Sequence, residues 1–261
     1  MKKLFFLLKY FRYRIKALDK HGVHSPFVFH LITEIFENKN SFYAFNAIEK
    51  LRQKMILSSE IIVVEDFGAG SKNLKTKKRA VKDIAKTSVK PTKYGQLLFR
   101  LIHYFEFKNI LELGTSLGIT TLYLAMPDSN AKVISIEGCP QTAALAKNNF
   151  SQIKCKNIEL IIGNFDEKLS ASINKLQKLD FVFFDGNHRK EATLKYFNEC
   201  LKAAHNDSLF VFDDIHWSAE MENAWEMIQK NNSVTVTIDL FFMGFVFFRK
   251  ELTKQDFIVK F

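Results

Sequence analysis

The second half of the chain alternates short apolar runs with longer amphipathic segments. The apolar runs predict buried strands at 109–113, 132–137, 158–162, 181–185 and 208–212. Segments with apolar residues at helical spacing separate them, for example 141–150, 190–203 and 218–230. Strands and helices that alternate in this way predict an α/β fold, with a parallel sheet covered by helices on both faces.

Two further runs at the end of this half, 233–240 and 244–249, are strand-like and are joined by a very short turn. They predict an antiparallel hairpin, which brings the sheet to seven strands. The first third of the chain instead predicts helices at 1–18, 27–37, 41–55, 81–88 and 93–105. We therefore predict a helical N-terminal extension at 1–107 that caps the site, and an α/β domain at 108–261.

The first predicted helix, 1–18, has apolar residues at helical spacing with basic residues beside them. The apolar positions are Leu4, Leu7, Leu8, Phe11, Ile15 and Leu18, and the flanking bases are Lys2, Lys9, Arg12 and Lys16. Such a helix can lie on an anionic membrane surface. It can equally pack on its own domain or on a second copy in a homodimer, and packing is the favoured prediction.

The formal net charge of +10 is unevenly distributed. Residues 1–100 hold 21 Lys and Arg against 8 Asp and Glu, whereas residues 101–261 hold 17 against 20. A basic N-terminal part fits a membrane surface, nucleic acid or an acidic substrate, and it fits equally well a set of solvated helix faces.

The scattered cysteines Cys139, Cys155 and Cys200 indicate reduced thiols and no disulfide frame or zinc site. No apolar run reaches the roughly 20 residues that span a bilayer, and the start lacks the features of a secretory signal. The expected location is therefore cytoplasmic, either free or peripheral to the inner face of the membrane.

One stretch resembles a strand followed by a glycine turn, but a charge run follows it. The run 61–64 leads into Gly68 and Gly70, and then into Lys72–Arg79. No strand ending in an acid follows at the distance that a nucleotide site requires. We interpret 61–79 as a loop, which either closes over the cofactor or substrate or simply links two helices.

The stretch 109–118 is the stronger candidate for a ligand site. A buried strand carries Glu112 and leads into Gly114 and Gly118, after which 119–125 reads as the start of a helix. Glycine permits a tight turn and close approach of a ligand to the backbone. The next strand ends on Glu137, about 20 residues after Gly114, a spacing at which a carboxylate can bind ribose hydroxyls. The dinucleotide fingerprint with three glycines is absent, so the pattern predicts a nucleotide-sized site of another kind.

The pattern Glu112-x-Gly114-x-x-x-Gly118 followed by Glu137 resembles the cofactor site of class I S-adenosylmethionine-dependent methyltransferases. The resemblance implies that the Gly114–Gly118 turn, with Thr115 and Ser116, receives the methionine part and the ribose. It further implies that Glu137 binds the ribose hydroxyls. Five parallel strands closed by a hairpin, in a Rossmann-like sheet, also resemble this family. By the same resemblance, the adenine is read after the third strand, at Gly163, Asn164 and Phe165.

Acidic residues and histidines follow the fourth and fifth predicted strands. Asp185 and His188 follow the fourth, and Asp213, Asp214 and His216 follow the fifth. Carboxyl ends of neighbouring parallel strands meet at one edge of a sheet, where such folds keep their active sites. Carboxylates gathered there can bind Mg²⁺, which would hold acceptor oxygens and lower a hydroxyl pKa.

This set resembles the catechol O-methyltransferase-like branch, in which two Asp and one Asn bind Mg²⁺. Asp185 and Asp213 match the two aspartates, whereas Asp214 stands where Asn is usual and His188 where that branch has a catalytic lysine. The sequence Asp-Gly-x-His is closer to a broader group of bacterial methyltransferases. His188 and His216 are each a candidate general base, metal ligand or simple hydrogen-bond partner of the carboxylates. Asp185 is a candidate contact for the methionine amine of the cofactor.

The sequence therefore predicts an S-adenosylmethionine-dependent methyltransferase that acts on a hydroxyl oxygen of a small molecule, with Mg²⁺ as a candidate cofactor. The alternatives are an RNA methyltransferase and a non-catalytic, membrane-associated protein that keeps the fold. The Asp/Asn-Pro-Pro-Tyr motif of adenine amino methylation is absent after the fourth strand. Cys139-Pro140 follows the second strand, not the fourth as carbon-five cytosine methylation requires. The acceptor is not identified by these residues.

Overall fold

The computed structural model describes residues 2–65, 77–87 and 91–261, without the side chains of residues 2–5. The chain divides into two compact units, one of residues 1–38 with 180–261 and the other of residues 39–179. No helix in the described ranges is both long enough and apolar enough to cross a bilayer. The units divide the chain at other points than residue 107, and the predicted boundary there stays a prediction.

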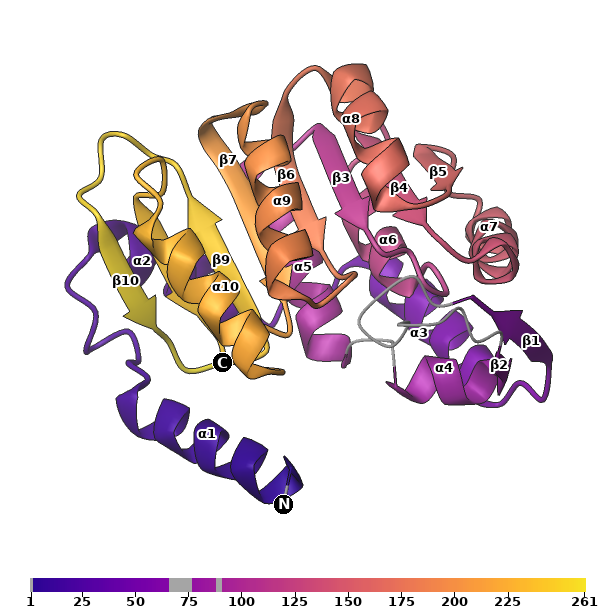
Figure 1. The fold of residues 1–261 in the computed structure, drawn as a ribbon, viewed down its shortest axis with the longest axis horizontal. Coiled ribbons are helices and arrows are strands. Elements are labelled where there is room, and N and C mark those ends of the chain that lie inside the picture. Colours follow the sequence, from indigo (N-terminus) through magenta and orange to yellow (C-terminus); the bar gives the residue numbers. More distant parts are fainter. Residues whose placement is uncertain (1, 66–76, 88–90) are drawn as a thin grey trace. The chain divides into compact units, whose positions relative to one another are not determined.

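The unit of residues 39–179 contains three parallel strands in the order β3-β4-β5 (Figure 1). They are β3 (Asn109–Leu113), β4 (Lys132–Glu137) and β5 (Ile158–Ile162), with the predicted bounds. The helices between and after them are α6 (Ile119–Ala125), α7 (Pro140–Ile153) and α8 (Phe165–Leu176). Strand pairing aligns Leu113 with Ile136 and Glu137 with Ile162, so the ends of these strands form one edge.

The predicted helices of residues 39–105 pack on this sheet unit. They are α3 (Tyr43–Ile56), α4 (Val81–Thr87) and α5 (Thr92–Phe105). Their buried side chains share one apolar cluster with α6 and α7, which includes Phe45, Phe99 and Phe150. Gly95 of α5 lies so close to Tyr123 that a Cβ would come within 2.5 Å of the ring. The close approach explains why this position lacks a side chain.

A two-stranded antiparallel sheet stands within the stretch that we interpreted as a loop. It pairs β1 (Ile61–Val64) with β2 (Lys77–Ala80), so the interpretation as a loop is wrong for residues 61–64 and 77–79. The first three side chains of β2 are charged and exposed, so no apolar alternation marked it as a strand. Backbone pairing with β1 stabilises β2 instead. Residues 66–76 lie outside the described residues.

The other unit contains strands in the order β6-β7-β9-β8-β10. They are β6 (Leu179–Phe184), β7 (Ala204–Asp213), β8 (Val236–Asp239), β9 (Met243–Phe247) and β10 (Gln255–Ile258). β9 is antiparallel to both β7 and β8, which confirms the predicted hairpin. β10 was not predicted; it pairs parallel to β8 and carries two polar residues in four, so its sequence resembles a loop.

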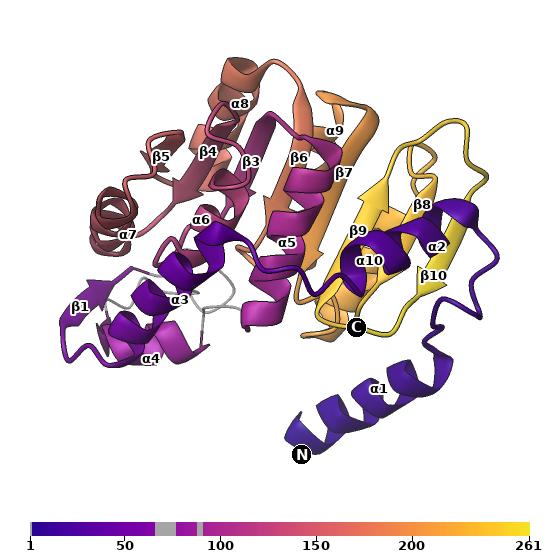
Figure 2. The ribbon, with the colours of Figure 1, turned by 180° about the vertical axis from the view of Figure 1, so that it is seen from behind.

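Helices cover both faces of these strands. Figure 1 shows α9 (Lys190–Leu201) and α10 (Ala219–Lys230) on one face, and Figure 2 shows α2 (Pro26–Leu31) on the other. α2 begins at the predicted cap Ser25 and continues as a π-helical turn, η1 (Ile32–Phe36). Edge-to-face contacts of Phe27 with Phe247 and of Phe36 with Phe245 fix this segment on β9.

The first helix, α1 (Lys2–Lys16), packs on its own unit, but not through the predicted apolar stripe. Its contacts use Tyr13 and Ala17, with Phe6 and Tyr10 beside them, against Phe241. An apolar pattern at helical spacing does not show which of two apolar faces is buried. Here the aromatic face is buried, because Phe241 offers it a ring on which three of these side chains meet.

Candidate functional site

The glycine turn after β3 has the backbone geometry that the sequence predicts. Gly114, Ser116 and Gly118 all have positive φ, at 105°, 49° and 79°. The amide of Gly114 donates to the carbonyl oxygen of Ile136, and the amide of Gly118 donates to that of Thr115. The turn is thus tied to β4 on one side and leads into α6 on the other.

Gly118 is required for two independent reasons. Its φ lies in the left-handed region that side-chain-bearing residues avoid. In addition, a Cβ at this position would lie 2.4 Å from the Phe150 ring and 3.1 Å from Ala146. The glycine therefore lets α7 pack directly on the start of α6, and the glycine turn keeps its shape.

Glu112 lies beneath the turn and is completely buried. Its Oε2 accepts hydrogen bonds from the hydroxyls of Thr121 and Ser135, both at 2.5 Å. The Ser135 hydroxyl also lies 2.5 Å from that of Thr115. Burial raises the pKa of Glu112 to about 8, although the two hydroxyls act in the opposite direction. Glu112 therefore carries a proton at neutral pH and serves to hold the turn, and its Oε1 has no hydrogen-bond partner among the described residues.

Glu137, at the end of β4, holds the turn from the other side. Its Oε2 accepts from the amide of Ser116 at 2.8 Å, and its Oε1 accepts from the amide of Cys139 at 2.9 Å. Burial raises the pKa of Glu137, and these amides counteract the increase. A carboxylate offers about four acceptor positions. Glu137 therefore keeps acceptor capacity on both oxygens, as a ligand of two neighbouring hydroxyls requires.

Gly163, Asn164 and Phe165 follow β5, as predicted. The amide of Gly163 donates to the carbonyl oxygen of Glu137, which places this turn beside the end of β4. Gly163 has φ 146°, Asn164 caps α8 by accepting from the amide of Asp166, and Phe165 is the first residue of α8. The structure thus brings the predicted cofactor residues of this unit together along one edge.

In the other unit, β6 and β7 present a separate polar cluster. The rings of Phe184 and Phe212 stack at 4.3 Å, and the residue that follows each of them in the chain is an aspartate, Asp185 or Asp213. These two aspartates and His188 each offer one ligand atom within 4.8 Å of the others. His188 Nε2 lies 3.7 Å from Asp185 Oδ1, and Asp213 is 1% exposed.

The grouping differs from the predicted metal set in one residue. Asp214 is not part of the cluster, and His188 takes the third place. Asp214 has a positive φ of 54°, and its amide donates to the carbonyl oxygen of Phe242. The backbone therefore turns away immediately after Asp213. Two carboxylates with one imidazole suit a divalent cation of borderline hardness at least as well as Mg²⁺.

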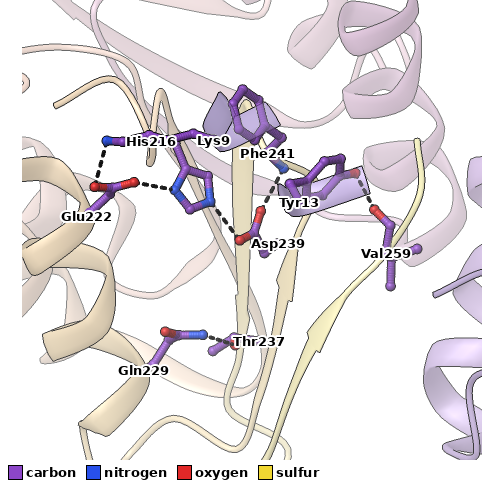
Figure 3. Close-up of polar contacts among 9 residues, drawn as sticks. All are labelled: Lys9, Tyr13, His216, Glu222, Gln229, Thr237, Asp239, Phe241 and Val259. Carbon is purple, nitrogen blue, oxygen red and sulfur yellow. Dashed lines mark hydrogen bonds and ion pairs between the residues drawn. The ribbon is translucent and has the colours of Figure 1, made fainter. Parts of the chain in front are cut away.

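His216 belongs to another network, which Figure 3 shows. Its Nε2 lies 2.8 Å from Asp239, and its Nδ1 lies 3.1 Å from Glu222. Burial opposes protonation of His216, but the two carboxylates outweigh burial and raise its pKa. Both ring nitrogens are thus engaged by carboxylates, and the ring stacks on Phe241. This arrangement favours a structural role for His216, and its predicted catalytic role stays a prediction.

Some residues of these sites gave no signal in the sequence. Thr121 and Ser135 hold Glu112, and Asp239 and Glu222 hold His216, from positions 6 to 23 residues away along the chain. A hydroxyl on a buried helix face or a carboxylate at the end of a strand is common in any α/β chain. Only the fold shows that these side chains meet.

Comparison with known proteins relates the fold and the glycine turn to one family. The family described as methyltransferase domain matches residues 111–215. Over these residues the chain is similar to a methyltransferase domain. The match includes the glycine turn, Glu137, and the cluster of Asp185, His188 and Asp213.

Two curated proteins that match part of this chain are both named as O-methyltransferases. A catechol O-methyltransferase of Niastella koreensis is 28% identical over 49% of this chain and 58% of its own length. The O-methyltransferase imqG of Aspergillus flavus is 27% identical over 41% of this chain and 45% of its own length. The chain therefore spans about half the length of the curated relatives that it matches.

Solved structures show the same fold. An O-methyltransferase from Bacillus cereus, crystallised in complex with SAH, superposes with a TM-score of 0.56 at 16% identity. The superposition covers 81% of this chain and 93% of the other. The α/β methyltransferase fold with its C-terminal antiparallel hairpin is thus confirmed.

Proposed function

We propose that the protein is an S-adenosylmethionine-dependent O-methyltransferase that acts on a hydroxyl group of a small molecule. The observation that carries the proposal is Glu137, whose carboxylate is held by the amides of Ser116 and Cys139 beside the glycine turn. This places an acceptor for ribose hydroxyls next to Gly114 and Ser116, which are only partly buried. The names of the two curated relatives support oxygen as the methyl acceptor.

The residues of the glycine turn fit the cofactor. Gly114 and Ser116 are only partly buried, and Glu137 supplies acceptors beside them. S-adenosylmethionine supplies an electrophilic methyl group on a sulfonium. The chain's own contribution is to hold the nucleoside, to align the acceptor oxygen, and to receive the proton that this oxygen loses.

Titration calorimetry with S-adenosylmethionine tests the cofactor. We expect binding by the wild type and loss of binding in Gly114→Arg and Glu137→Ala. The exposed variant Leu57→Ser is the matched control and should bind as the wild type does. The proposal fails if the wild type does not bind, or if both site variants bind normally.

We further propose that Asp185, Asp213 and His188 hold a divalent cation, Mg²⁺ or a softer ion such as Mn²⁺. Such a cation would supply Lewis-acid polarisation of the acceptor hydroxyl. His188 is one-quarter exposed, so it can also meet the acceptor directly and take its proton. The two roles for His188 differ in their effect on metal affinity.

Metal binding can be measured without any substrate, by the change in the electron paramagnetic resonance signal of Mn²⁺ and by competition with Mg²⁺. We expect Asp213→Asn to abolish binding and the exposed Asp207→Asn to leave it unchanged. His188→Ala should weaken binding if His188 is a ligand and leave it intact if His188 is only the base. Failure of the wild type to bind either ion would remove the cation from the proposal.

A further inference from the structure

The exposed face of α1 is an apolar feature of this unit that the proposed function leaves unused. Leu7, Leu8, Phe11 and Ile15 are 61%, 52%, 63% and 69% exposed. We call these four residues the apolar stripe. They follow one another at helical spacing on a helix whose other side already packs on Phe241.

The packed side holds α1 firmly in place. The Tyr13 hydroxyl donates to the carbonyl oxygen of Val259 at 2.5 Å, and Lys9 pairs with Glu222 at 2.7 Å (Figure 3). At 3.6 residues per turn, the apolar stripe and the packed face lie roughly 140° apart around the helix. The stripe therefore cannot turn into its own unit without breaking these contacts.

The charge of residues 1–18 indicates which kind of partner covers the apolar stripe. Residues 1–18 contain six Lys and Arg and no Asp or Glu. At 3.6 residues per turn, Arg12 and Lys16 border the stripe on one side, and Arg14 borders it on the other. An apolar stripe between two rows of basic residues is the pattern of a helix that lies in the interface of an anionic membrane.

A second copy of the helix is a poorer partner. Two such helices would bring twelve basic residues together with no acidic residue on either helix to compensate. The stripe also extends over nine residues, little more than one heptad, whereas an independent coiled coil needs about three or four. We propose that α1 binds the protein to an anionic lipid surface through the apolar stripe, with Arg12, Arg14 and Lys16 facing the headgroups.

Vesicle flotation of the full chain tests the proposal, with phosphatidylcholine vesicles compared with vesicles that contain roughly one-third phosphatidylglycerol. We expect flotation with the anionic vesicles only. The triple variant Leu7→Ser, Phe11→Ser, Ile15→Ser should bind more than tenfold more weakly, because three exposed apolar side chains no longer enter the interface. Its matched control, Leu57→Ser, changes a side chain that is 81% exposed on the other unit and should float as the wild type does.

Charge variants test the second half of the proposal. Each of Arg12→Gln, Arg14→Gln and Lys16→Gln should weaken binding roughly fivefold at moderate salt, as expected for one charge near an anionic surface. S-adenosylmethionine binding by the stripe variant should match that of the wild type. A loss of flotation is then separable from any failure of the methyltransferase proposal.

Three results would overturn the assignment. The first is no flotation of the wild type. The second is flotation that the stripe variant retains, which would mean adsorption by charge alone. The third is a dimer in sedimentation analysis without lipid that the stripe variant converts to monomer, which would make a second copy the partner of the stripe.

Discussion

The buried carboxyl of Glu112 makes the stability of the protein depend on pH in an unusual direction. Its pKa is about 8 in the folded chain, against a reference of 4.5. Above pH 4.5 the unfolded chain releases this proton, whereas the folded chain keeps it up to about pH 8. The folded state therefore binds more protons within this window, and the free energy of unfolding must fall as pH rises.

The magnitude follows from the two pKa values. Between pH 5 and pH 8, Glu112 should lower the free energy of unfolding by about 3 to 4 kcal/mol, since one pKa unit corresponds to about 1.4 kcal/mol. The decrease should end above pH 8, where both states are ionised. Glu112→Gln cannot ionise, and its amide oxygen can still accept from Thr121 and Ser135.

Urea denaturation of the wild type and of Glu112→Gln, repeated from pH 5 to pH 9, measures this dependence. We expect the difference in free energy of unfolding between the two proteins to change by about 3 to 4 kcal/mol over this range, in favour of the variant at high pH. Glu60→Gln makes the same chemical change at an exposed position and should keep the wild-type slope. Parallel pH profiles for the wild type and Glu112→Gln would refute the reasoning.

Three other perturbations have definite expected results. Gly118→Ala should cost about 2 to 5 kcal/mol in urea denaturation, because a left-handed φ and the Phe150 ring both oppose a Cβ. His216 has a raised pKa, so its pairing with Asp239 should stabilise the fold fully below pH 6.5. This stabilisation should be lost as pH rises through the pKa of the folded state. The variant His216→Gln should remove this pH dependence of stability. Tyr13→Phe removes a buried hydrogen bond, should cost about 1 kcal/mol, and should speed amide hydrogen exchange in α1.

Two of these have a control in the same chain. Gly22→Ala adds a Cβ no closer than 3.2 Å to its neighbours and should change stability by less than about 1 kcal/mol. The exposed Tyr104→Phe should leave exchange in α1 unchanged. Equal destabilisation by Gly118→Ala and Gly22→Ala, an unchanged pH profile in His216→Gln, or unaltered α1 exchange in Tyr13→Phe would each contradict the corresponding argument.

The parts of the fold that the sequence predicts are those with short, mostly apolar runs. β3, β4 and β5 begin and end at the predicted residues, because most of their residues are apolar, although β5 is only partly buried. β2 and β10 were missed because edge strands need only backbone pairing, which leaves their side chains polar. Residue patterns thus describe burial well and hydrogen-bonded edges poorly.

The candidate functional site was likewise predicted from the sequence only in part. The turn at 114–118 was predicted because glycine permits a tight turn, and both of its glycines have positive φ. The grouping of His188, in place of Asp214, with Asp185 and Asp213 depends on how the backbone turns after β7. Binding of a ribose by Glu137 stays a prediction. Binding of a metal by the cluster of Asp185, His188 and Asp213 also stays a prediction.

The partners of α1 lie far along the sequence, and this distance matters during synthesis. The Tyr13 hydroxyl bonds to a carbonyl 246 residues downstream, and Phe241 is almost as distant. Both apolar faces of the nascent helix therefore stay uncovered while residues 39–179 are translated. That unit can collapse before the partners of α1 are synthesised. In that interval, chaperones or the membrane would meet α1 before its intramolecular partner exists.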